Sequence, residues 1–172
     1  MFDPLLAFGN TSGYLSGSDM IAPAATRLFE HSLRTARWKR LLGRLHGELR
    51  RLERLECMQA VARQSARKPD AVRAVALAQI HGSVDGGSAF DSEFYPVTDR
   101  TRGRWVRVAT ALIRGESLPP VELIHVGERY FVVDGHHRIS AARMMRFTHI
   151  DAVVTVWEAT GQIGPGCISS RT

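Results

Sequence analysis

The chain has 172 residues, of which 44% are hydrophobic and 23% are charged, and its formal net charge is +6. This length and composition predict one ordinary folded domain and exclude a wholly disordered chain. No apolar run approaches the roughly 18 residues of a membrane span, so we expect no membrane partner. The two cysteines, Cys57 and Cys167, lie in unrelated contexts. They exclude a disulfide framework or a cysteine zinc site, and they favour a cytoplasmic location.

The positive charge of the chain is concentrated in one segment. Residues 27–68 contain 12 Lys and Arg against 4 Asp and Glu, whereas the rest of the chain contains 11 against 13. Residues 1–23, at the start of the chain, are rich in Gly, Ser, Asn and Pro, and they predict a flexible arm. We therefore expect a nearly neutral body with one basic segment in front of it.

The basic segment predicts a helical extension over 24–68, with a helix from Ala24 to about Gln64. Apolar residues recur at three- and four-residue steps between Trp38 and Leu55, and arginines fill the positions between them. We expect the apolar face to pack on the domain or, alternatively, to form a homodimer through 27–64. Contact between the arginines and the phosphates of DNA is a further alternative, because a basic face is necessary for such contact but not sufficient.

Alternating strand and helix patterns follow the basic segment. Val72–Leu77 is rich in Val, Ala and Leu and predicts a strand. The next stretch, 82–92, is rich in Gly, Ser and Asp and predicts a loop. A helix is predicted over Arg100–Arg114, with Asp99 as its N-cap and Gly115 closing it.

Two stripes of side chains are expected on this helix. The core stripe consists of Trp105, Val108, Ala109 and Leu112. The basic stripe consists of Arg100, Arg104, Arg107 and Arg114. Like charges on one stripe repel each other, so they need solvent, acidic neighbours or an anion beside them. An anionic ligand is the more specific of these alternatives.

The last third of the chain predicts a hairpin, a helix and a strand. Val121–Val126 and Arg129–Val133 predict two strands, and Gly127-Glu128 forms the turn between them. A helix is expected over His136–Arg146 and a final strand over Ile150–Trp157.

Together these elements predict an α/β (α+β) domain over 70–158, in which a small mixed sheet packs with helices. The helical extension precedes this domain. The tail over 159–172 is rich in Gly and Ser and is expected to be disordered.

The sequence Asp134-Gly135-His136-His137-Arg138 is the most informative for function, because it places polar residues between an apolar strand and an apolar helix. The first N–H groups of a helix bind anions, phosphate above all. We therefore expect Gly135, His136, His137 and Arg138 to hold phosphate groups. Asp134 could be the N-cap, orient a histidine or Arg138, or bind a phosphate-bound Mg²⁺. Asp134, His136 and His137 are the candidate catalytic residues; surface histidines beside a capping Asp134 are the alternative.

Residues 118–156, LPPVELIHVGERYFVVDGHHRISAARMMRFTHIDAVVTV, resemble the core of the ParB/sulfiredoxin superfamily. In that family a hairpin leads into a Gly-x-x-Arg turn, a helix and another strand. The stretch from about Val72 fits the first half of the family more loosely, and residues 1–70 lie outside the resemblance. The resemblance implies the same mixed fold for the domain.

The motif residues resemble three branches of this superfamily to different degrees. Partition-type ParB proteins grip the triphosphate of CTP with Gly-Glu-Arg-Arg-x-Arg-Ala, of which Gly135, Arg138 and Ala141 match. Sulfiredoxins have Gly-Cys-His-Arg, but His136 stands where their catalytic cysteine would be. Free-serine kinases hold the phosphates of ADP with Asp-Gly-His-x-Arg, which this chain matches at all four named positions. This last branch is therefore the nearest at the site.

The resemblance implies a nucleotide-binding protein that holds ATP or CTP phosphates, together with Mg²⁺, at the Asp134–Arg138 turn. Any reaction would be phosphoryl transfer or nucleoside-triphosphate hydrolysis. A further catalytic carboxylate would come from outside the motif, with Glu93, Asp91 and Glu122 as candidates. The alternative from another class of function is a non-enzymatic, DNA-associated module that uses the basic helical segment.

Overall fold

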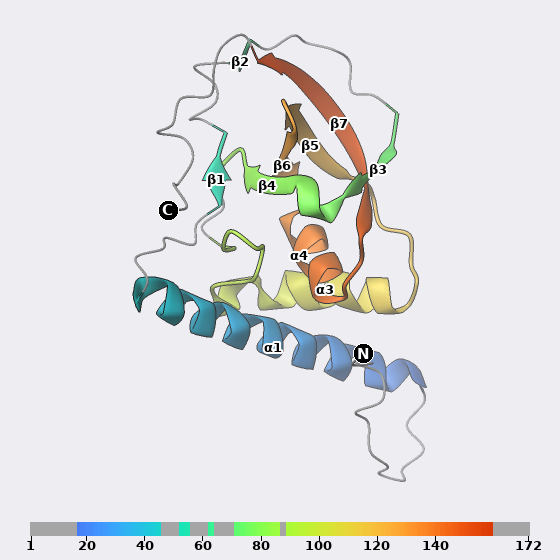
Figure 1. The fold of residues 1–172 in the computed structure, drawn as a ribbon. Coiled ribbons are helices and arrows are strands. Elements are labelled where there is room, and N and C mark those ends of the chain that lie inside the picture. Colours follow the sequence, from blue (N-terminus) through green and yellow to red (C-terminus); the bar gives the residue numbers. More distant parts are fainter. Residues whose placement is uncertain (1–16, 46–51, 56–61, 64–70, 87–88, 160–172) are drawn as a thin grey trace.

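A computed structural model gives the fold and describes residues 17–45, 52–55, 62–63, 71–86 and 89–159 (Figure 1). The α-helices within these ranges are α1 (Gly17–Leu45), α3 (Arg102–Ile113) and α4 (His136–Met144). The strands are β1 (Glu53–Arg54), β2 (Ala62–Arg63), β3 (Arg73–Ala76), β4 (Ile80–Ser83), β5 (Val121–Val126), β6 (Arg129–Asp134) and β7 (His149–Ala159). Two short 3-10 helices are η1 (Leu77–Gln79) and η2 (Asp99–Thr101).

The strands form one mixed sheet, as the sequence predicts. Its order is β1-β4-β6-β5-β7-β2, and β3 pairs with β7 as well. β5 and β6 are the two arms of the predicted hairpin and run antiparallel, whereas β5 and β7 run parallel. β4 runs parallel to β6, so the end of β4 lies beside the end of β6 and the turn that follows it. This pairing brings the loop after β4 towards the polar motif.

The helices cover one face of the sheet, with α1 packed on α3 and α3 on α4 (Figure 1). The indole of Trp105 on α3 is fully buried and lies edge-on to the ring of Phe29 on α1, with 5.5 Å between ring centroids. Its Nε1–H donates a hydrogen bond of 2.8 Å to Ser140 Oγ on α4. One side chain of the predicted core stripe therefore joins all three helices.

Helix α1 differs from the helix expected over Ala24–Gln64 at both ends. It begins at Gly17 and includes Pro23, so residues 17–23 do not belong to a flexible arm. Its described part ends at Leu45, and strands β1 and β2 lie within the range that was expected to be helical, so the helix does not reach Gln64. Leu55, expected on the helix, is instead buried beyond β1 and packs on the face of the sheet away from the helices. The rest of the expected arm and tail lies outside the described residues.

The face of α1 that packs on the domain is also not the one expected. The buried positions are Ala25, Phe29, Ser32, Leu33, Ala36 and Gly43. The apolar residues from Trp38 to Leu45 that suggested a packing face are exposed. The helix has two apolar faces, and the one that contains Phe29 and Leu33 packs on the domain.

Two local expectations between β3 and α3 are corrected as well. Gly82 and Ser83 belong to strand β4 rather than to a loop, because their backbone pairs with β6. Asp99 is not the N-cap of the following helix but the first residue of η2, and its carboxylate lies 3.5 Å from Arg37 Nη2. The helix itself and its closing glycine are confirmed, since α3 ends at Ile113 and Gly115 has φ of +69°.

Replacing Phe29 tests whether α1 belongs to the core of the domain. We expect Phe29→Ala to lower the free energy of unfolding by about 3–5 kcal/mol, because it leaves a cavity beside Trp105. Leu45→Ala on the same helix is the matched control, since that side chain is 76% exposed; it should change stability by less than about 0.5 kcal/mol. Urea unfolding of the three proteins measures both effects. Equal stability of the two variants would contradict the packing.

Candidate functional site

The polar motif lines a cavity of about 240 Å³ between the loop after β4, helix α3 and the first turn of α4. The loop contributes Asp85, Ala89 and Phe90, and α3 contributes Arg104 and Val108. All five motif residues, from Asp134 to Arg138, line the same cavity. The structure therefore brings together every site residue that the sequence predicts within the motif.

Gly135 is the turn between β6 and α4, and the fold needs a glycine there. Its φ is +106°, a backbone conformation that residues with a side chain rarely adopt. A Cβ on Gly135 would lie 2.5 Å from a methyl carbon of Val121, so the two chain segments could not approach as they do. Gly135 is also the N-cap residue of α4, which corrects the interpretation of Asp134 as the N-cap.

The first turn of α4 presents backbone N–H groups to the cavity. The first intrahelical hydrogen bond runs from Ile139 N to Gly135 O, at 3.0 Å. The N–H groups of His136, His137 and Arg138 precede it and have no acceptor within the helix. Together with the helix dipole they give this end of α4 a partial positive charge, which attracts an anion.

Arg138 is held in place by three acceptors. Its Nη2 donates to Asp134 Oδ2 at 2.5 Å. Its Nη1 donates to the carbonyl oxygens of Pro119 and Pro120, the latter at 2.7 Å. Of the roles considered for Asp134, the structure shows the pairing with Arg138. In this arrangement much of the guanidinium fork is committed to protein acceptors, and Arg138 fixes α4 against the start of β5.

The ring of His136 is fixed by Ser83 at the end of β4. His136 Nε2 lies 2.7 Å from Ser83 Oγ, which lies 3.3 Å from Val132 O. A hydroxyl has one hydrogen, so both contacts are hydrogen bonds only if Ser83 donates to the carbonyl and His136 Nε2–H donates to Ser83. Burial lowers the pKa of His136, so its ring is neutral at physiological pH. The backbone N–H of His136, rather than its Nε2–H, is then available to an anion.

His137 packs edge-on against Phe90, with 5.1 Å between ring centroids and 90° between ring planes. Burial, then the charge of Arg104 and, once it is protonated, that of His136, lower the pKa of His137 to about 4. The ring is therefore uncharged near neutral pH. An anion bound in the cavity would raise this pKa, because it would offset the positive charge of Arg104.

Arg104 and Asp85 are cavity residues that the motif alone does not reveal. Arg104 is exposed on α3, one residue before the buried Trp105, and its charge lowers the pKa of both histidines. In the sequence, Arg104 is visible only as one member of the basic stripe. A bound anionic ligand was one of the interpretations of that stripe. Asp85 lies in the predicted loop and had no distinguishing signal.

The three carboxylates considered outside the motif do not line this cavity. Glu93 forms an ion pair with Lys39 and lines a separate cavity beside Arg143. Asp91 is buried, and its Oδ1 accepts hydrogen bonds from the backbone N–H groups of Glu93 and Tyr95 at 3.0 and 2.9 Å. Glu122 is exposed on β5 opposite Asp134. The pairing of β5 with β6 places Glu122 beside the motif.

The described residues hold no group of three or more His, Cys, Asp and Glu side chains arranged to bind a metal ion. Asp85 and Asp134 nevertheless line the same cavity. Two carboxylates are too few for a metal site made of protein alone. They are the usual number for Mg²⁺ that is held mainly by phosphate oxygens and water.

Comparison with known proteins gives one structural likeness. No protein-family model matches the chain, and no curated protein does. The crystal structure of a sulfiredoxin from Arabidopsis thaliana is similar over 52% of this chain and 89% of its own, with a TM-score of 0.41 and 13% identity. The fold is of the mixed kind that the resemblance implied. At this level of likeness the comparison carries no inference about activity.

Adding a methyl group at Gly135 tests the constraint on the turn. We expect Gly135→Ala to lower the free energy of unfolding by about 2 kcal/mol or more, from the positive φ and the contact with Val121. Gly103→Ala on α3 is the control, because a Cβ there meets nothing within 4 Å. That variant should be neutral or more stable by up to about 1 kcal/mol. Thermal or urea unfolding measures both, and a neutral Gly135→Ala would contradict the geometry.

The low pKa of His137 predicts a pH dependence of stability. Below pH 6.5 the unfolded chain binds a proton at this histidine, whereas the folded chain does so only near pH 4. The free energy of unfolding should therefore fall as the pH is lowered from about 6.5 to about 4, and His137→Gln should reduce this dependence. NMR titration of the ring measures the pKa directly. A value at or above 6.5 would contradict the burial described here.

Proposed function

We propose that the protein binds the phosphate groups of a nucleotide, ATP or CTP, together with Mg²⁺, in the cavity at the first turn of α4. One observation carries the proposal. Arg104 from α3 and the first turn of α4, with Gly135 at its head, line the same cavity although they lie about 30 residues apart in the chain. A cation and a row of backbone N–H groups around one cavity are a common means of binding phosphate.

The size of the cavity supports the phosphates as the bound part. Its volume of about 240 Å³ is below the roughly 300 Å³ at which sites for whole drug-sized ligands begin. A nucleotide would place its phosphates inside and its sugar and base outside. This division agrees with the residues present, because the polar groups of the cavity belong to the motif, Asp85 and Arg104.

The carboxylates support a phosphate that carries a metal ion. Asp85 and Asp134 would repel a bare phosphate, whereas they would attract Mg²⁺ bound to one. When bound, Mg²⁺ neutralises the charge of the phosphate oxygens. Asp134 also pairs with Arg138, so its share in holding the metal would come with some loosening of that ion pair.

Phosphoryl transfer or nucleotide hydrolysis at this site would depend on positioning and charge neutralisation. His137, with a pKa of about 4, is a weak base near neutral pH, and the Nε2–H of His136 is committed to Ser83. General bases work best when their pKa is near the operating pH. Asp134, His136 and His137 are therefore better suited to binding and orienting a ligand than to acid–base catalysis. The proposed function is accordingly nucleotide binding.

Isothermal titration with ATP, CTP and ADP, each with and without Mg²⁺, tests the proposal. We expect Mg²⁺ to strengthen binding and Arg104→Ala to weaken it by about tenfold or more, since a charge-assisted hydrogen bond contributes roughly 1.5–3 kcal/mol. Arg107→Ala is the matched control, because Arg107 is exposed on the same helix and does not line the cavity.

The control separates a specific site from general attraction to a basic helix. Equal loss of affinity in Arg104→Ala and Arg107→Ala would contradict the site. So would the failure of all three nucleotides to bind the unmodified protein.

A further inference from the structure

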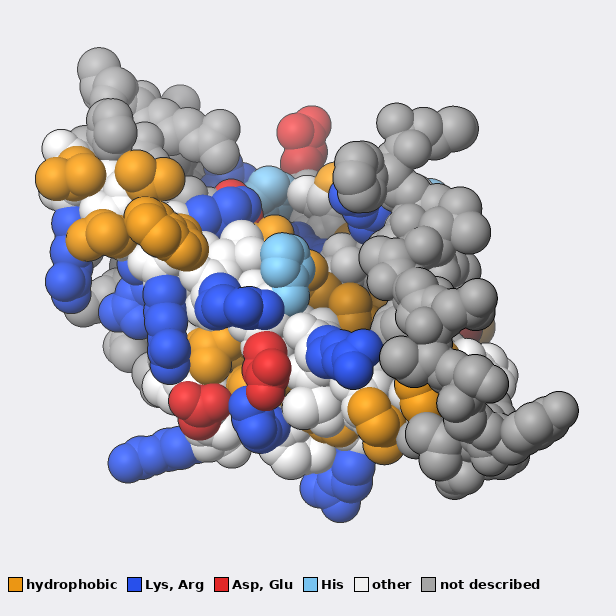
Figure 2. Space-filling model, turned by 90° about the horizontal axis from the view of Figure 1, so that it is seen from below, with side chains coloured by type: hydrophobic (Ala, Val, Ile, Leu, Met, Phe, Trp, Pro, Cys, Tyr) orange, Lys and Arg blue, Asp and Glu red, His pale blue; other side chains and the backbone are white. Residues whose placement is uncertain are grey.

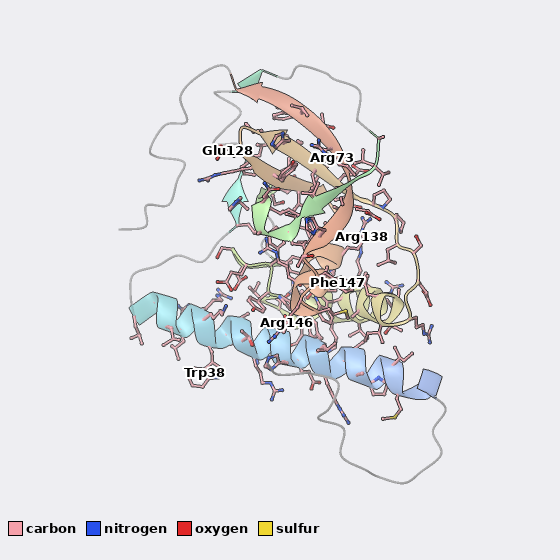
Figure 3. The ribbon with its side chains drawn as sticks, turned by 45° about the vertical axis from the view of Figure 1, so that its right-hand side comes forward. Trp38, Arg73, Glu128, Arg138, Arg146 and Phe147 are labelled. Carbon is pink, nitrogen blue, oxygen red and sulfur yellow. The ribbon has the colours of Figure 1, made fainter. Side chains whose placement is uncertain are left out.

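We propose that the C-terminal half of α1 lies on the surface of an anionic membrane. The helix carries four large apolar side chains that point into solvent, and we call them the α1 apolar stripe: Trp38, Leu41, Leu42 and Leu45. They are 66%, 52%, 51% and 76% exposed. Their spacing of three, four and seven residues from the first places them on one face of the helix. Trp38 projects away from the sheet (Figure 3).

The stripe lies on the side of α1 opposite to its packed face. The packed residues, such as Phe29 and Ala36, are fully buried against the rest of the domain. The stripe therefore does not contribute to folding, and exposing it to water costs free energy. A contiguous group of exposed apolar side chains rimmed by polar residues marks an interaction surface.

The charge around the stripe is positive. Residues 31–45 contain five Lys and Arg and no Asp or Glu. Two of the five are paired within the domain, Arg37 with Asp99 and Lys39 with Glu93. Arg34 lies one turn before Trp38 and Arg44 lies next to Leu45. Both are exposed, and within the described part of the chain neither has an ion-pair partner. Figure 2 shows Lys and Arg side chains beside the apolar group on the face seen from below.

These features match a helix that lies in a membrane interface. Such helices place Trp and Leu into the boundary of the lipid headgroups while Lys and Arg contact anionic lipids. None of the described helices has the length and apolarity to cross a bilayer, but a helix at the surface needs neither. We expected no membrane partner because the sequence lacks a membrane-spanning segment. The lack of such a segment does not exclude a helix that binds at the membrane surface.

The alternatives expected for this segment fit the stripe less well. Four side chains are few beside the roughly 20–30 residues that each partner contributes to a stable protein interface. In a second copy, moreover, the arginines beside one stripe would face those beside the other, and like charges repel. DNA phosphates would contact the arginines but leave Trp38 and the leucines without an apolar partner.

Vesicle binding by the full chain tests the proposal. Flotation with phosphatidylcholine vesicles and with phosphatidylcholine–phosphatidylglycerol vesicles measures the partition coefficient, and the fluorescence of Trp38 reports its transfer from water. We expect binding only to the anionic vesicles, with a blue shift of the emission that Trp38→Phe abolishes. Arg34→Gln with Arg44→Gln should weaken binding about 30-fold.

A second pair of variants tests the apolar part. Leu41→Asp with Leu45→Asp should abolish vesicle binding and leave the circular dichroism spectrum unchanged, because both side chains are exposed. Val72→Asp is the control, since it changes an exposed apolar residue (56%) outside α1 and should bind as the unmodified protein does. Equal binding to neutral and anionic vesicles, or to neither, would overturn the proposal. A dimer seen in light scattering that the two aspartates dissociate would assign the stripe to a second copy and overturn the proposal. A DNA duplex that displaces the protein from vesicles, and that the aspartate variant still binds, would overturn it as well.

Discussion

The close approach of Gly135 to Val121 is the constraint on which the site depends. No side chain fits between the end of β6 and the start of β5, so the chain turns sharply and α4 begins at once. Arg138 then secures the turn through Asp134 and the carbonyl oxygens of Pro119 and Pro120. The first N–H groups of α4 are fixed at the cavity as a result, before any ligand is bound.

The other wall of the cavity depends on the burial of Trp105. This side chain joins α1, α3 and α4 through its contact with Phe29 and its hydrogen bond to Ser140. Successive residues of a helix are about 100° apart. Burying Trp105 therefore leaves its neighbour Arg104 on the exposed side of α3, at the cavity. Folding and the placement of the cation have the same cause, and the N-terminal helix contributes to the site through the core.

The hairpin, the turn and the motif could be predicted because local signals agree there: two segments rich in strand-forming residues, a Gly127 turn, and a glycine between strand and helix. The limits of α1 could not, because its basic segment contains two apolar faces and periodicity alone does not say which one packs. The role of Arg104 was visible only as one of four arginines on a stripe. Arg104 and Gly135 line the same cavity because of how α3 packs on α4, and no local sequence pattern predicts that packing.

The central claim is that the first turn of α4 binds phosphate, and backbone NMR tests it most directly. Titration of the labelled protein with ATP and Mg²⁺ should shift the amide signals of His136, His137 and Arg138 first and furthest, because their N–H groups would donate to phosphate oxygens. The side-chain Nε signal of Arg104 should shift with them. If ATP binds while these signals stay in place, the phosphates lie elsewhere and the account is contradicted.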